Sequence, residues 1–434
     1  MSLAGTDLAR HIEQTPIVDT HEHLEKEDTW VRDGPADVLA DLFSNYTLAD
    51  LASAGASSDA VERLTDDSDD DLDARWAPVA DAWHAIQYTG YGESVRRLAK
   101  DIYGIEQIDA ESLRTAQCKL EEIRRPGQRL HILRDLAHIE HVQTDDKEWA
   151  CLPDPSGPDF FFYDISWVGF AGRGVDFERL AAETGVTVSD LQSLRRAMET
   201  LFDKYAPCAI AVKSQHAYNR PLIWSPPDPS EAERQLLAIL RDPTQPMPLV
   251  LGDWGLARGV ELAIEFGLPF KIHTGVLGGT GRMSVASVNP SHLCELTKVY
   301  PQARFVLMHA GYPYDRELIA MLKHYPNAYG DLCWTWSIDP YSSAEFVRRY
   351  LHAAPVNKLF AFGGDTRWPT SSYAYAMQMR DHLTRALQAE VEDGYLTEMQ
   401  AMDVATRLMR ENQRSLFDVD GTRNAVADRL ALQP

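Results

Sequence analysis

Short apolar runs alternate with amphipathic stretches along most of the chain. The short runs are rich in β-branched and aromatic residues and predict buried strands, whereas stretches with apolar residues every three to four positions predict helices. The expected strands lie at residues 16–23, 137–146, 159–168, 208–214, 269–275, 304–311, 327–333 and 358–365. The expected helices between them cover residues 189–205, 230–240, 258–266, 290–300 and 315–325.

This alternation predicts an α/β fold, and eight strands predict a closed (β/α)8 TIM barrel. Two regions depart from it: residues 24–130 read as a largely helical insertion after strand 1, and residues 371–434 as extra C-terminal helices. We therefore treat residues 1–434 as one barrel domain that contains the insertion. Since a segment that follows a barrel strand emerges at the face that carries active sites, we expect a lid or a dimer contact. An appendage without function is the alternative.

The first predicted strand ends in the segment "IVDTHEH", which places His21 and His23 two positions apart. In a strand, such residues point to the same side with Cα atoms about 6–7 Å apart. Two imidazoles at this separation can bind one divalent cation. A pair of polar residues near a turn is the alternative for these two histidines alone.

Other polar residues follow apolar runs in the same way. Because the carboxyl ends of the strands meet at one mouth of a barrel, these side chains are expected to lie close to His21 and His23. A single histidine on an apolar strand is more often a core residue, but the whole set predicts a metal site. The further members are Lys213, His273, His309 and Asp365, at the predicted strands 4, 5, 6 and 8.

Composition and charge limit the class of protein. The chain has 434 residues, of which 44% are hydrophobic and 25% charged, as in soluble globular proteins. Its formal net charge of −23 argues against nucleic acid and anionic membranes as partners. The N-terminal segment lacks the apolar stretch of a signal peptide, and the five cysteines are scattered. We therefore expect a cytoplasmic protein that does not span a membrane.

Several motifs together resemble the amidohydrolase superfamily of metal-dependent β/α barrels. They are "DTHEH", "AVKSQHAYNR", "FKIHTG", "VLMHAGYPY", "HYPNAYGDL" and "FAFGGDTRWP". Within that superfamily the chain resembles most the branch fused to glutamine-synthetase-like proteins, and more distantly the uronate isomerases. The resemblance covers most of residues 12–415.

The resemblance implies that His21, His23 and Asp365 are metal ligands, with His273 as a fourth. Imidazole and carboxylate donors suit zinc, our first choice, but also manganese or iron(II). Asp365 could also act as a general base. His309 would either bind a second metal or polarise a substrate carbonyl as a neutral imidazole.

Two cationic residues have open roles under the same resemblance. Lys213 would be either carbamylated, as in two-metal relatives, or an ammonium that binds an anionic substrate group. Arg367 follows Asp365 in an Asp-x-Arg pattern that the uronate isomerases share, and could clamp a substrate carboxylate. A surface salt bridge is the alternative for Arg367.

These points predict a metal-dependent hydrolase that acts on a small amide, lactone or ester bearing a carboxylate. A uronate-isomerase-like enzyme of sugar acids is the first alternative, and a metal-dependent decarboxylase the second. A barrel that has lost its chemistry and serves as a scaffold is the non-enzymatic alternative. We expect a small anionic substrate as the partner, and a homo-oligomer.

Overall fold

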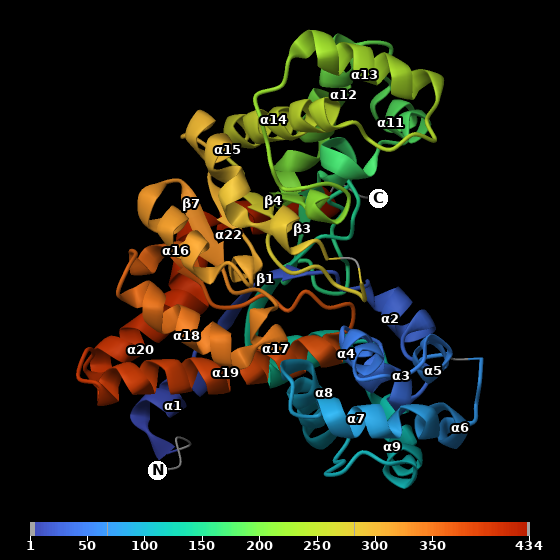
Figure 1. Ribbon diagram of the computed structural model, residues 1–434, viewed down its shortest axis with the longest axis vertical. Helices are drawn as coiled ribbons and strands as arrows, with labels where there is room; N and C mark the ends of the chain where they lie inside the picture. The colour runs from blue at the N-terminus through green and yellow to red at the C-terminus, as the bar shows by residue number, and fades with distance from the viewer. Residues whose placement is uncertain (1–4, 67, 282, 432–434) are drawn as a thin grey trace.

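Eight parallel strands lie side by side in chain order in the computed structural model of the protein (Figure 1). The structure describes residues 5–66, 68–281 and 283–431. The predicted (β/α)8 barrel is therefore confirmed, and every strand falls within its predicted range. The strands are β1 (Ile17–Glu22), β2 (Ile139–Thr144), β3 (Phe161–Ser166), β4 (Ala209–Ser214), β5 (Phe270–Ile272), β6 (Phe305–Leu307), β7 (Ala328–Asp331) and β8 (Leu359–Phe360).

Backbone hydrogen bonds beyond β8 bring the two edges of the sheet together. The amide of Thr20 donates to the carbonyl of Phe362 over 3.1 Å, and the amide of Asp365 donates to the carbonyl of His21 over 2.9 Å. β8 itself has only two residues, so the segment that follows it completes the contact with β1. Asp365 is thereby tied by its own backbone to the strand that carries His21.

Helices surround the barrel and follow most of its strands. All five predicted helices are present, but the third begins earlier than its pattern indicated, at Leu249. Glycines interrupt the apolar periodicity there because the helix packs closely on its neighbour: a Cβ at Gly255 would lie 2.2 Å from the carbonyl oxygen of Phe170. The helices are α11 (Phe177–Thr184), α12 (Leu191–Tyr205), α13 (Pro229–Arg241), α14 (Leu249–Glu265), α15 (Cys294–Val299), α16 (Asp315–His324), α17 (Thr335–Ile338) and α18 (Pro340–Leu351).

The segment between β1 and β2 is helical and builds a core of its own. Val38, Phe43 and Trp83 are among the buried residues of that core. In Figure 1 this segment lies beside one end of the long helix α19 (Pro369–Glu392). Its helices are α2 (Glu27–Asp33), α3 (Val38–Phe43), α4 (Thr47–Ser53), α5 (Ser58–Leu64), α6 (Leu72–Trp76), α7 (Ala80–Ile86), α8 (Gly90–Asp101), α9 (Ala110–Ile123) and α10 (Gln128–Leu130).

The ends of the chain add further helices. The C-terminal region, expected over 371–434, is helical through most of its described part, and residues 432–434 lie outside the described residues. No helix among the described residues is long and apolar enough to cross a membrane. The added helices are α1 (Asp7–Gln14), α19, α20 (Glu398–Thr406), α21 (Asn412–Leu416) and α22 (Val419–Ala431).

Candidate metal centre

Six of the seven residues singled out in the sequence meet at the mouth of the barrel. All come from the carboxyl ends of β1, β4, β5 and β6 or from the segment after β8. Five are almost completely buried, and the side chain of His23 is 16% exposed. The six are His21, His23, Lys213, His273, His309 and Asp365.

The first cluster joins both histidines of β1 to Asp365. The Nε2 atoms of His21 and His23 lie 3.2 Å and 3.4 Å from Asp365 Oδ1. Such spacing of one ligand atom from each of three residues is compact enough for them to surround a metal ion. The structure thus brings His21, His23 and Asp365 together, and their role as metal ligands stays a prediction.

The second cluster contains His273, His309 and again Asp365. His309 Nε2 lies 2.9 Å from His273 Nδ1 and 3.7 Å from Asp365 Oδ2. These three residues form a second group that could hold a metal ion. His273, expected as a fourth ligand beside His21 and His23, is thus grouped with His309 instead, and Asp365 is common to both clusters.

Backbone carbonyls fix which ring nitrogen of three histidines carries the proton. A carbonyl can only accept, so His23 Nδ1 donates to Asp145 O over 2.5 Å, and His309 Nδ1 to Cys333 O over 3.0 Å. His273 Nε2 likewise donates to Val276 O over 2.7 Å. In the neutral rings, the nitrogens that face Asp365 therefore carry bare lone pairs.

The described part of the chain places no hydrogen-bond donor between these lone pairs, an arrangement that suits a cation. Two bare nitrogens, of His273 and His309, face each other at 2.9 Å, a contact that is repulsive unless a cation lies nearby. Among the described residues, the buried Oδ1 of Asp365 has no hydrogen-bond partner either. The donor set, neutral imidazoles with one carboxylate, suits a divalent transition metal.

The protonation states agree with this arrangement. Burial lowers the pKa of all four histidines, and that of His309 to about 4, so the rings are neutral at pH 7. Burial alone would raise the pKa of Asp365, but the adjacent imidazoles hold it well below its ordinary value. The centre is therefore an ionised carboxylate among neutral rings, the protonation state in which these groups bind metals.

Backbone strain and close packing position Asp365. Its φ is +56°, and that of His309 is +62°, in a left-handed region that side chains other than glycine rarely adopt. The preceding Gly364 leaves room for buried Glu22, because a Cβ there would lie 1.9 Å from Glu22 Oε1. Glu22 in turn accepts hydrogen bonds from the amide and hydroxyl of Thr366. This packing explains Gly364, and a Cβ at Gly363 would lie 2.8 Å from Cys333 Sγ, so close packing requires both glycines of "GGD" before Asp365.

Lys213 reaches the first cluster from β4. Its Nζ lies 2.9 Å from His21 Nε2, and its side chain is fully buried. An unmodified lysine can donate this hydrogen bond, and a carbamylated lysine at this place would add a carboxylate between the two clusters. Both roles considered for Lys213 thus stay predictions.

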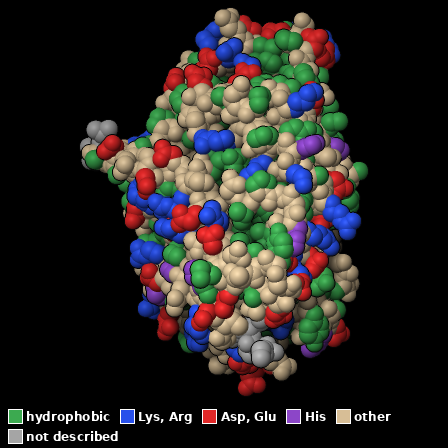
Figure 2. Space-filling model, turned by 90° about the vertical axis from the view of Figure 1, so that its left-hand side faces the viewer, with side chains coloured by type: hydrophobic (Ala, Val, Ile, Leu, Met, Phe, Trp, Pro, Cys, Tyr) green, Lys and Arg blue, Asp and Glu red, His purple; other side chains and the backbone are tan. Residues whose placement is uncertain are grey.

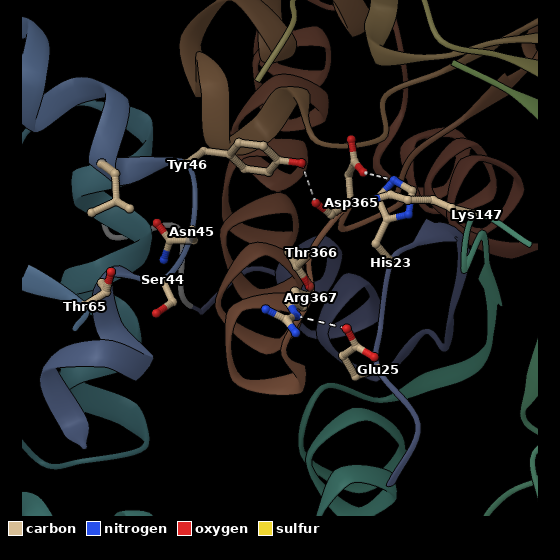
Figure 3. Close-up of a pocket in the computed structure, with 11 residues that line it drawn as sticks. His23, Glu25, Ser44, Asn45, Tyr46, Thr65, Lys147, Asp365, Thr366 and Arg367 are labelled. Atoms are coloured by element: carbon tan, nitrogen blue, oxygen red, sulfur yellow. Dashed lines mark hydrogen bonds and ion pairs between the residues drawn. The ribbon is translucent and has the colours of Figure 1, made fainter. Parts of the chain in front are cut away.

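A polar cavity of about 580 Å³ opens above the centre, and the helical segment between β1 and β2 forms one wall of it (Figure 3). Tyr46, from the start of α4, donates a hydrogen bond of 2.9 Å to the backbone carbonyl of Asp365 and packs against Trp334, with ring centroids 4.2 Å apart. The insertion therefore contributes directly to the cavity, while its action as a lid stays a prediction.

Arg367 lines the same cavity but turns away from His23 and Asp365. Its Nε donates to Glu25 Oε1 over 3.0 Å, and its side chain is 57% exposed (Figure 3). The salt bridge that was the alternative for this residue is thus present. Whether Arg367 also binds a substrate carboxylate remains a prediction.

The sequence analysis did not single out several residues that line the cavity, among them Tyr46, Lys147 and Arg173. Tyr46 lies in the insertion, where no strand-end pattern marks it. Lys147 and Arg173 follow β2 and β3, so their strand-end positions were a signal, but each lies beyond the first residues of its loop. A position directly at the end of an apolar run therefore marks His21 and Asp365 but not these loop residues.

A family model described as amidohydrolase matches residues 158–402, more than half of the chain. This protein belongs to the amidohydrolase family. The predicted resemblance to that superfamily is confirmed, and with it a place among metal-dependent hydrolases and isomerases.

One curated relative and three solved structures extend the comparison. Protein fluG of Emericella nidulans is 28% identical over 293 residues, which are 60% of this chain and 34% of that protein, so the chain spans about a third of its length.

A uronate isomerase of Thermotoga maritima has a TM-score of 0.76 at 14% identity over 94% of this chain and 96% of its own. A glucuronate isomerase of Caulobacter crescentus has a TM-score of 0.74 at 18% identity, over 95% and 93%. A protein of Lactobacillus casei assigned as a metal-dependent hydrolase has a TM-score of 0.67 at 16% identity, over 99% of both chains. At these identities the three structures show the fold alone.

Proposed function

We propose that this amidohydrolase-family protein is a metal-dependent hydrolase that acts on a small amide, lactone or ester bearing a carboxylate. The observation that carries the proposal is the set of bare imidazole nitrogens around Asp365, at the base of a polar cavity. His21, His23 and Asp365 would hold one divalent cation, and His273 and His309 would complete a second site with the same carboxylate. Zinc is our first choice, with manganese or iron(II) as alternatives.

When bound, such a cation supplies Lewis-acid polarisation of a carbonyl and makes water acidic enough to attack at neutral pH. Asp365 accepts the proton of the attacking water and then delivers it to the leaving group, because its carboxylate is ionised and buried beside the reacting centre. Tyr46 holds the backbone of Asp365 in place through its hydrogen bond. The cavity volume of about 580 Å³ suits a small ligand.

Oxygen-18 labelling tests hydrolysis directly. The metal-loaded protein is screened on N-acyl amino acids, lactones and uronic acids, and any hit is run again in oxygen-18 water. Label in the carboxylate at the cleaved bond supports the hydrolase. An isomer of the substrate as product, with label only in an exchangeable carbonyl, would reject it.

Isomerisation of a sugar acid is the second candidate. The cavity wall is polar and includes the side chains of Ser44, Asn45, Tyr46 and Thr65, which can hydrogen-bond a polyhydroxylated substrate (Figure 3). Two structures with the same fold are a uronate isomerase and a glucuronate isomerase. In the same screen, conversion of a uronic acid to its keto isomer would support an isomerase, and release of carbon dioxide would indicate a decarboxylase.

A further inference from the structure

Two cationic side chains line the cavity mouth without an internal partner. Lys147 and Arg173 border a space of about 440 Å³ that His23, Tyr46 and Asp365 also line. Both side chains are exposed, and neither has an ion pair or hydrogen bond within the described ranges 5–66, 68–281 and 283–431. A cationic pair beside a reacting centre is available to an incoming anion.

Other arginines near the cavity are already neutralised. Arg367 pairs with Glu25, Arg220 with Asp253 over 2.5 Å, and Arg179 with Glu148. Over the face shown in Figure 2, basic and acidic side chains are interspersed. In a chain with a net charge of −23, two cations at the cavity mouth that have no ion pair among the described residues favour a bound anion there.

Within the described residues, the acidic side chains beside Lys147 accept backbone amides of their own loop and form no ion pair with its ammonium group, and Asp145 Oδ2 has no hydrogen-bond partner. Asp145 Oδ1 accepts the backbone amide of Lys147 over 2.8 Å, and Asp146 Oδ1 accepts the amide of Glu148 over 3.1 Å. Glu148 itself pairs with Arg179. These acceptors fix the backbone of the loop and hold Lys147 at a φ of +64°. The loop is thus ordered by its own carboxylates while the ammonium group stays free.

The same loop is joined to the metal centre. The carbonyl of Asp145, two residues before Lys147, accepts the hydrogen bond from His23 Nδ1. Figure 3 shows Lys147 on the His23 side of the cavity, opposite Tyr46. One substrate could therefore place its reacting group at Asp365 and a distant anionic group at the loops after β2 and β3.

We propose that Lys147 and Arg173 are specificity-determining residues that bind a carboxylate of the substrate remote from the reacting bond. The guanidinium can bind a carboxylate in bidentate fashion, and the ammonium adds a second charge. This inference rests on the proposed function for its reaction, but binding of the anion itself needs no turnover. It assigns the anion site to these two residues and not to Arg367, which Glu25 holds.

Binding of dicarboxylates by the metal-loaded protein tests the inference. Malonate, succinate, glutarate and adipate are compared by calorimetry with their monoamides, so that one carboxylate can reach the centre and the other the cationic pair. We expect at least one dicarboxylate to bind about tenfold more tightly than its monoamide, as a charge-assisted hydrogen bond predicts. In the variants Lys147→Asn and Arg173→Met that ratio should fall toward one.

The control variant is Arg134→Met, which removes the same charge from an exposed residue before β2 that pairs with its neighbour Asp135. The preference for the dicarboxylate should survive in it. No preference in the unmodified protein, a preference that persists in both Lys147→Asn and Arg173→Met, or an equal loss in the control would each overturn the inference. Loss of preference in the two variants, in a protein that hydrolyses none of the screened substrates, would uphold the anion site and reject the proposed hydrolase.

Discussion

Two groups of polar side chains are buried inside the barrel, and they differ in whether the protein satisfies them. Lys271 and Asp164 form an ion pair whose Nζ lies 2.9 Å from both carboxylate oxygens and donates to the carbonyl of Thr20 over 2.7 Å. The group around Asp365 is buried to a similar degree, yet its nearest nitrogens carry lone pairs and its Oδ1 has no hydrogen-bond partner among the described residues.

The difference separates a structural pair from a ligand site. Removing charges from water costs several kcal/mol per ion unless partners compensate. Lys271 and Asp164 compensate each other, so this pair needs nothing from outside. In the cluster at the mouth, Lys213 can donate to His21. Among the described residues, however, no donor faces Asp365 Oδ1 or the lone pairs of His273 and His309, and a bound cation would compensate them.

The largest effect is expected from a substitution in the group around Asp365, which lacks internal hydrogen-bond partners among the described residues. Asp365→Asn removes the carboxylate common to both clusters, so we expect the turnover of any substrate found to fall by about a thousandfold or more. The metal-free protein should also melt at a lower temperature at neutral pH, because the fold holds the pKa of this carboxyl below its ordinary value and the ionised group is lost. Steady-state kinetics and thermal melts measure both effects. A variant that keeps a tenth of the activity would remove Asp365 from the mechanism.

The next largest effect is expected when the ion pair of Lys271 and Asp164 is disrupted. Lys271→Met leaves Asp164 buried without its cation and should destabilise the protein by about 3–5 kcal/mol, while metal content stays unchanged. The double variant Lys271→Met with Asp164→Leu should recover most of that loss. Denaturant unfolding of the three proteins measures the difference. Loss of metal in Lys271→Met would show that the two groups are not independent.

A smaller effect on stability is expected from a third buried carboxyl, that of Asp41. Asp41, in the insertion, accepts hydrogen bonds from the hydroxyls of Tyr103 and Thr370, and burial raises its pKa to about 6. Because the folded state then holds this proton more tightly than the unfolded chain, its contribution to stability falls as the pH rises from about 4 to about 6. The expected loss is on the order of 2–3 kcal/mol.

The variant Asp41→Asn removes that titration and is also a matched control for Asp365→Asn. Measured as a difference in melting temperature, the variant should gain on the unmodified protein between pH 4 and pH 7. Its metal content and activity at neutral pH should stay within about twofold. A difference that does not vary with pH would show that Asp41 has an ordinary pKa.

Sequence patterns predicted the barrel well because both signals are local. Each strand is an apolar run of characteristic residue types, and each ligand follows such a run. The start of α14 was placed too late, since glycines that allow close packing on Phe170 also interrupt the apolar period. Such packing depends on a neighbour distant in the sequence.

The candidate site was predicted only as a set of residues. Lys271 and His273 lie two positions apart in "FKIHTG", and nothing in that segment distinguishes the structural lysine from the cluster histidine. Their partners do so, and those come from β3 and β6. Likewise, the pairing of His273 with His309 and the contact of Tyr46 with Asp365 depend on segments far apart in the chain.

Metal content is the measurement that tests the central claim most directly. Elemental analysis of protein loaded with zinc, manganese or iron(II) should find at least one equivalent in the unmodified protein and in Lys271→Met. The double variant His21→Asn with His23→Asn should lose the ion of the first cluster, and His273→Asn with His309→Asn that of the second. If both double variants keep the content of the unmodified protein, the cluster around Asp365 is not a metal site and the account is wrong.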